Sequence, residues 1–138
     1  MLNDFYSYIA VVSFDEDGIS INFPDLPGCF TCADHEEEVS KMAREVLGLH
    51  LWSMENDREV IPSPSSLKHI HTNENDTTMF VDVFMPPIRD KVNNRVMKKT
   101  LTIPRWLNDE AEKHDINFSQ LLQTALKDYL QIDVPVAR

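Results

Sequence analysis

The sequence predicts an α+β protein made of two small units. Aromatic and β-branched residues form several short runs, some of them alternating with polar residues, which is typical of strands. Apolar residues also recur at helical spacing in longer segments. Residues 1–90 hold five Lys and Arg against seventeen Asp and Glu, whereas residues 91–138 hold eight against six. Because the charge is divided in this way, two domains are favoured over one.

The first unit is predicted to begin with a β-hairpin. Residues 5–14 are rich in aromatic and β-branched side chains, and residues 19–23 alternate between apolar and polar. Residues 15–18, Asp-Glu-Asp-Gly, are a turn signal that joins the two runs. Two prolines in residues 24–28 remove backbone donors, so they predict a stiff loop after the second strand. The predicted inward-facing residues of the second strand are Ile19, Ile21 and Phe23.

A helix is predicted from Asp34 to about Asn56. Asp34 is a favourable N-cap, and Glu37 follows three residues later at the spacing of a capping box. The acidic residues near this start suit the positive end of the helix dipole. Apolar residues then recur on one stripe of the helix. The predicted stripe consists of Val39, Met42, Ala43, Val46, Leu49 and His50.

A proline- and serine-rich segment, residues 60–66, follows the helix and is expected to be extended and exposed. Residues 79–85 predict a third strand, which the next two prolines end. The first domain is therefore expected to span residues 1–85. Residues 86–95 are expected to form a linker.

The second domain, residues 96–138, is predicted to be a strand followed by two helices. The strand covers residues 96–103, and the first helix runs from Pro104 or Arg105 to about His114. Asn117 is the expected N-cap of the last helix, with Gln120 at the third position after it.

The strand at residues 96–103 has no partner within its own unit. Pairing with the same strand of a second chain fills the hydrogen-bond ladder and joins two half-cores. The outward-facing lysine and threonines of such a ribbon can reach base edges in the major groove, and the N-terminus of the last helix can bind a phosphate. The predicted DNA-contacting residues are Lys98, Thr100, Thr102, Asn117, Phe118 and Ser119.

Three segments of the second unit, residues 98–104, 117–122 and 125–129, resemble the ribbon-helix-helix family of repressors, of the Arc and MetJ type. The resemblance implies a homodimer formed through the strand that binds operator DNA. It also implies that residues 98, 100 and 102 read bases while residues 117–119 hold a phosphate. Two such dimers are expected to join as a dimer of dimers.

Residues 17–31, Asp-Gly-Ile-Ser-Ile-Asn-Phe-Pro-Asp-Leu-Pro-Gly-Cys-Phe-Thr, resemble the signature of HicB antitoxins, and the order of elements around them is similar over residues 5–85. The resemblance implies an incomplete RNase H-like domain that binds and neutralises a HicA-type toxin, a small basic mRNA-cleaving ribonuclease. It further implies that the second domain represses the shared operon. Candidate toxin contacts are Asp34, Glu36, Glu37, Glu38, Ser63 and Ser65.

Two other classes of function stay open from the residues. A stand-alone ribbon-helix-helix transcription regulator would use the first domain to sense a small ligand. A nuclease would need several carboxylates converging on Mg²⁺, but the acids at residues 15–17 and 36–38 favour solvated segments. We therefore expect no enzyme activity.

A metal or redox site was considered at Cys29, Cys32 and His35, with His69 or His71 as a fourth ligand. An isolated CxxC pair is a weak signal, so we expect no metal and no cofactor. The chain has no apolar run long enough to span a membrane and no secretory signal, which predicts a cytoplasmic protein without membrane contact.

Overall fold

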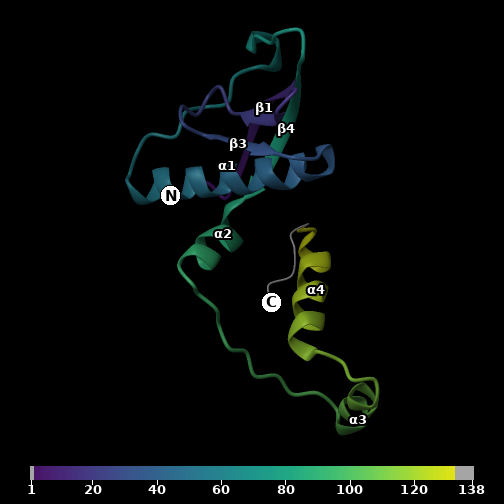
Figure 1. The fold of residues 1–138 in the computed structure, drawn as a ribbon. Helices are drawn as coiled ribbons and strands as arrows, with labels where there is room; N and C mark the ends of the chain where they lie inside the picture. Colours follow the sequence, from purple (N-terminus) through teal and green to yellow (C-terminus); the bar gives the residue numbers. More distant parts are fainter. Residues whose placement is uncertain (1, 133–138) are drawn as a thin grey trace. The chain divides into compact units, whose positions relative to one another are not determined.

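The structure, a computed structural model, describes residues 2–132 of the 138-residue chain. The chain divides into two compact units, Met1–Arg95 and Val96–Arg138. Figure 1 shows the elements of each unit. Each unit is described by itself.

The first unit is built on one antiparallel sheet of four strands in the order β3-β2-β1-β4. The strands are β1 (Phe5–Asp15), β2 (Gly18–Asn22), β3 (Phe30–Ala33) and β4 (Asp76–Phe84). The predicted hairpin is confirmed, because β1 pairs antiparallel with β2. Gly18 closes its turn at φ +139°, a backbone conformation that L side chains rarely adopt. β3 was not predicted, and β4 begins three residues before the predicted strand.

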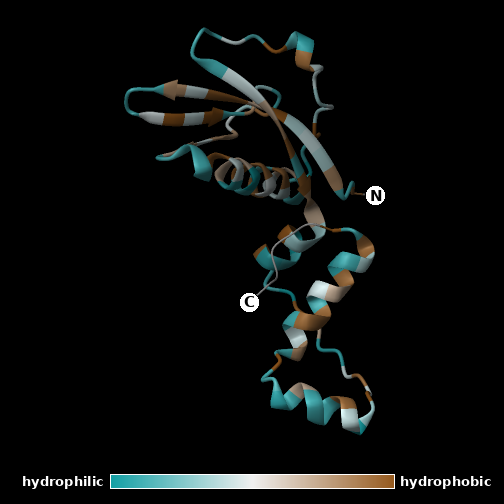
Figure 2. Cartoon of the chain, turned by 90° about the vertical axis from the view of Figure 1, so that its right-hand side faces the viewer, coloured by the Kyte–Doolittle hydropathy of each residue, from teal (hydrophilic) through white to brown (hydrophobic). Residues whose placement is uncertain are grey.

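The core of this unit lies between one face of the sheet and α1 (Val39–Asn56). Tyr8, Ala10 and Val12 alternate along β1 and point toward the helix. The predicted inward set of the second strand is confirmed, since Ile19, Ile21 and Phe23 are all buried. Figure 2 shows α1 lying along one face of the sheet.

The start of the long helix differs from its prediction. A 3-10 turn, η1 (Glu36–Glu38), precedes α1, and its N-cap is His35 without a side-chain bond. The predicted capping box between Asp34 and Glu37 is wrong, because the Asp34 backbone N–H donates to Glu38 Oε2 at 3.3 Å. The acid that reaches back is one position further along because the N-cap itself, His35, is one position later than predicted.

The buried stripe of α1 also differs from its prediction. Leu49 is 54% exposed, although it was placed on the inward face. Apart from Gly48, the buried residues follow a four-residue step, so the leucines two positions to either side of Leu49 face the sheet instead. The buried residues of α1 are Val39, Ala43, Leu47, Gly48 and Leu51.

Residues 86–92, predicted as part of a linker, instead belong to a helix, α2 (Met85–Val92). The two prolines that follow the strand occupy the first helical turn, where a missing N–H costs nothing. Arg89 fixes this helix to α1 by donating to both carboxylate oxygens of Glu55, at 2.9 and 2.8 Å. It also donates to Asp4 at 2.7 Å. Beside it, Ile88 lies over Gly48 of α1, where a Cβ would come within 2.5 Å of Ile88 Cδ1.

The second unit contains two helices, α3 (Arg105–Lys113) and α4 (Phe118–Leu130), and both were predicted. The predicted strand over residues 96–103 is not formed in the single chain, which has no regular structure there. A strand needs a neighbour for its backbone groups, and none is offered to this segment by the described part of its own chain. No described residue of this unit, residues 96–132, is buried.

Candidate functional site

The first candidate site is the cationic segment that leads into α3. Residues 91–105 carry five Lys and Arg and no Asp or Glu. Lys98, Thr100 and Thr102 are exposed in a segment without regular secondary structure. Because these three residues occupy every second position of the sequence, any strand formed here places all three on one face. That face offers one ammonium group and two hydroxyl groups, which suits phosphate and base edges in nucleic acid.

The start of α4 carries the other predicted DNA-contacting residues. Asn117 caps the helix as predicted, since its Oδ1 accepts from the Gln120 backbone N–H at 3.1 Å. Ser119 Oγ accepts from Gln123 Nε2 at 3.2 Å, and Phe118 is 44% exposed. The first backbone N–H groups of any α-helix have no partner within the helix, so this end favours an anion.

Unit 2 also exposes the apolar residues that its predicted strand and helices were expected to bury. Trp106 is 68% exposed, and Leu126 is 50% exposed. α3 and α4 still place their apolar residues at helical spacing, as in a helix that covers a core. The unit therefore presents a half-core within one chain. The exposed large apolar residues within residues 96–132 are Val96, Met97, Leu101, Ile103, Trp106, Leu107, Ile116, Phe118, Leu121, Leu126, Tyr129 and Leu130.

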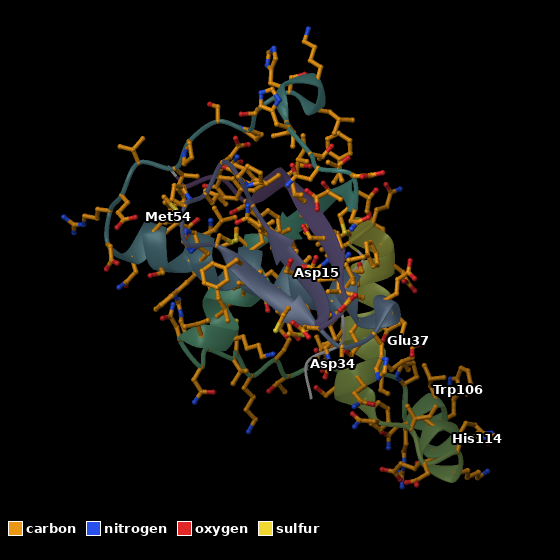
Figure 3. All side chains as sticks on the ribbon, turned by 45° about the horizontal axis from the view of Figure 1, so that its top comes forward. Asp15, Asp34, Glu37, Met54, Trp106 and His114 are labelled. Carbon is orange, nitrogen blue, oxygen red and sulfur yellow. The ribbon has the colours of Figure 1, made fainter. Side chains whose placement is uncertain are left out.

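The predicted toxin-contacting residues of unit 1 lie in two separate places. Asp34, Glu36, Glu37 and Glu38 are exposed at the start of α1. Ser63 and Ser65 belong to the segment that follows the end of the same helix. Figure 3 shows Asp34 and Glu37 at one end of α1 and Met54 at the other. An 18-residue helix is about 27 Å long, so the structure does not bring the two groups together.

Ser65 is held by the proline-flanked loop between β2 and β3, a contact that the sequence analysis missed. Its backbone N–H and its Oγ donate to the two oxygens of Asp25 at 2.8 and 2.6 Å. Tyr8 OH donates to the carbonyl oxygen of Pro62 nearby in the same segment. Burial raises the pKa of Tyr8 to about 12, so the phenol keeps its proton and remains a donor. No short-range sequence signal marks the Asp25–Ser65 pair, because 40 residues separate its members.

A cavity of about 620 Å³ adjoins this loop, between residues 25–27, the last turns of α1 and the segment after it. His50 and Glu59 supply polar groups, and Met54 supplies an apolar one. His50, predicted on the apolar stripe of the helix, is half-buried here. The cavity is open to solvent and is lined by both polar and apolar side chains. The lining residues are Asp25, Leu26, Pro27, His50, Ser53, Met54, Glu59, Val60 and Pro62.

The considered zinc site is not assembled. Cys29 is fully buried, whereas Cys32 is exposed. The Cys29 thiol points toward the Val46 carbonyl oxygen at 3.8 Å, and burial raises its pKa to about 11, which disfavours the thiolate that zinc requires. Across residues 2–132, no three His, Cys, Asp or Glu side chains are grouped so as to hold a metal ion. This also holds for the acids at residues 15–17 and 36–38, which a nuclease would need to converge on Mg²⁺.

No helix within the described part of the chain is long and apolar enough to cross a membrane.

Comparison with protein families places these features in context. Residues 8–126 match the family described as HicB_like antitoxin of bacterial toxin-antitoxin system. A UPF0150 protein, Ta0767 of Thermoplasma acidophilum, is 34% identical over 56 residues, which is 40% of this chain and 81% of that protein. An uncharacterised 14.9 kDa protein of Haemophilus phage HP1 is 25% identical over 91 residues, 66% of this chain and 68% of the phage protein.

Two solved structures have a similar fold. A chain of a toxin–antitoxin complex from Streptococcus pneumoniae has 22% identity and a TM-score of 0.54, with 91% of this chain and 99% of that chain covered. The antitoxin HicB of Burkholderia pseudomallei has 16% identity and a TM-score of 0.51, with 91% and 98% covered. The mixed α+β fold with an antiparallel sheet is therefore shared with HicB antitoxin structures.

Proposed function

Starting from the family match over residues 8–126, which places this chain in the HicB-like antitoxin family, we propose that it neutralises a HicA-type toxin and represses its own operon. Unit 1 binds the toxin, and unit 2 binds operator DNA as a ribbon-helix-helix dimer. The chain acts by binding in the cytoplasm and not by catalysis. Unit 1 then corresponds to the incomplete RNase H-like domain, with its antiparallel sheet covered by α1.

One observation supports the dimeric regulator most directly: unit 2 has a half-core and an unpaired cationic segment, but no buried residue among those described. Helices of nine and thirteen residues are marginal in isolation. A second copy supplies both a strand for residues 96–103 and an apolar surface for α3 and α4. The paired strands then present Lys98, Thr100 and Thr102 twice, at the width of a major groove.

The toxin is the second partner, and charge supports this assignment. Residues 1–90 carry a net charge of −12, so a basic protein is attracted to unit 1 while nucleic acid is repelled from it. The acidic run at residues 34–38 is the densest part of that charge. We assign it to toxin recognition together with Ser63 and Ser65. A dimer of dimers follows where two operator half-sites lie side by side.

A stand-alone regulator with a ligand-sensing first domain is the second candidate, because the cavity beside Asp25 and His50 has a size suited to a small molecule. The two candidates differ in what unit 1 binds. Co-expression with the product of the adjacent gene distinguishes them. Co-purification of a small basic protein supports the antitoxin, and its absence, with operator binding that responds to a small metabolite, supports the regulator.

Operator binding is tested by a mobility-shift assay on the promoter DNA. We expect the double substitution Lys98→Ala and Thr100→Ala to weaken operator binding without weakening toxin binding, because the two sites lie in different units. The operator-binding constant of the wild type should fall steeply as the salt concentration rises. A plot of its logarithm against the logarithm of the salt concentration should have a strongly negative slope, since several phosphates are contacted per dimer. A flat salt response, or loss of both activities together, contradicts the proposal.

A further inference from the structure

The sheet of unit 1 has a second face, opposite α1, which we call the open face. Its residues follow from the strand alternation: positions next to the core residues Tyr8, Ala10 and Val12 point the other way. The register aligns Ile9 with Phe80 and Phe5 with Phe84 across β1 and β4. No α-helix of the described part of unit 1 packs on this side (Figure 2). Its apolar residues are Phe5, Ile9, Val11, Phe30, Phe80 and Phe84.

The open face has an aromatic surface over a buried centre. Phe5, Phe30 and Phe80 are 64%, 67% and 62% exposed. Ile9 and Val11, in the central strand, are 2% and 8% exposed. Phe30 lies on β3 and Phe80 on β4, the two edge strands of the sheet, which are about 14 Å apart. The aromatic residues lie on three of the four strands, since β2 contributes none. Exposed aromatic surface of this extent is typical of a site for another protein.

The charges on the open face are of one sign. Asp76 and Asp82 of β4 point to this side. None of the strand positions that alternate onto it is Lys or Arg. Ser13 Oγ donates to Asp76 at 2.6 Å, and that hydrogen bond, with one from the Asn73 backbone N–H, lowers the pKa of Asp76. The carboxylate therefore stays charged at neutral pH.

We propose that the open face is the docking surface for the toxin, with Phe30 and Phe80 as its aromatic anchors and Asp82 as a partner for a toxin cation. This inference rests on the proposed function and names the surface that performs it. The exposed aromatic side chains suit the buried part of an interface, where a few large side chains carry most of the affinity. The Asp residues suit a basic protein.

Two other occupants fit the open face less well. A second copy of this chain would bring a second set of Asp residues against the same surface, because a two-fold contact presents identical patches to each other. Without a cation on either copy, those carboxylates would lose water without gaining partners. Operator DNA would meet the same carboxylates with its phosphates. A basic toxin supplies the charges that both of these occupants lack.

The open face and the acidic run at residues 34–38 then serve different steps of toxin binding. Exposed charge mainly accelerates the encounter and is screened by salt. Buried aromatic contact mainly slows dissociation. Substitution in the run should lower the association rate constant, whereas substitution of Phe80 should raise the dissociation rate constant.

The test measures binding kinetics between the full-length chain and a catalytically inactive variant of the toxin encoded by the adjacent gene. We expect Phe80→Ser to weaken binding by about 30-fold, the loss typical of a central aromatic anchor, mainly through faster dissociation. Leu49→Ser is the matched control, because Leu49 is an apolar residue of similar exposure on α1, the opposite layer. It should leave affinity within about twofold.

The outcomes separate this inference from the proposed function. If the wild-type chain does not bind the toxin, both are overturned. If it binds and both Phe80→Ser and Phe30→Ser bind equally well, the open face is not the docking surface, and the proposed function stands. If these variants instead lower the oligomeric state at unchanged toxin affinity, a second copy occupies the face and the inference is overturned. Circular dichroism and thermal unfolding verify that each variant is folded. If one of the two variants does not fold, the other still tests the open face.

Discussion

Dilution should unfold the second unit while the first remains folded. Unit 2 lacks buried residues among those described, so under the proposed function its helices depend on a second chain. α3 and α4 contain nine and thirteen residues, against eighteen and eight in α1 and α2. Below the dimer Kd we therefore expect the helical signal in circular dichroism to fall by nearly half. The strand signal from the sheet of unit 1 should not change.

A substitution at Leu126 measures how much this apolar surface contributes. Its side chain is 50% exposed in the single chain, so dimerisation can bury about the remaining half. Full burial of a leucine stabilises by roughly 1.5–3 kcal/mol, which leaves about 0.8–1.5 kcal/mol for each copy. Two-fold symmetry doubles this value, so Leu126→Ala should raise the dimer Kd by roughly 10- to 150-fold.

Analytical ultracentrifugation over a concentration series measures that Kd directly. Thr124→Ala is the matched control, since Thr124 is exposed on α4 and lies on the side of the helix away from Leu126. It should change the Kd little. A chain that keeps its full helical signal as a monomer, or a Leu126→Ala variant with an unchanged Kd, would refute the reasoning from burial.

Two further predictions concern unit 1. Glu55→Gln should destabilise unit 1 by about 2 kcal/mol in urea unfolding, because Arg89 keeps its charge but loses a charged bidentate partner. The Glu55 side chain is 5% exposed and lies 2.8 Å from Arg89. An equal effect from the exposed control Glu59→Gln would show that the ion pair is not the cause. In the native chain only Cys32 should react rapidly with a thiol reagent near pH 8, since Cys29 is buried and has a pKa of about 11. Rapid labelling of both thiols without denaturant would contradict the burial of Cys29.

The hairpin and the helices of unit 2 could be predicted because their signals are local. Residues 19–23 alternate with period two, and Asn117 with Gln120 marks a helix start within three residues. β3 was missed because it has four residues, too few for a periodic signal to stand out. α2 was missed because a proline pair has two meanings, the end of a strand or the first turn of a helix.

The candidate sites were harder still to predict from local sequence signals. The Asp25–Ser65 contact and the aromatic open face each depend on pairings between distant segments. Phe80 belongs to a run, residues 79–85, that is almost continuously apolar, so the sequence does not say which side faces the core. The register with β1 decides it: Val81 and Val83 are buried, and Phe80 is not.

The unequal burial of the two units has a consequence for regulation. Unit 1 has its own core and needs no second copy to fold, so under the proposed function toxin binding is first order in this chain. Operator binding requires two copies of unit 2 and is second order or higher. At low concentration the chain therefore neutralises toxin before it represses transcription. Repression follows only when enough chain accumulates to form dimers. If Leu126→Ala lowered repression and toxin neutralisation to the same degree, this separation of orders would be wrong.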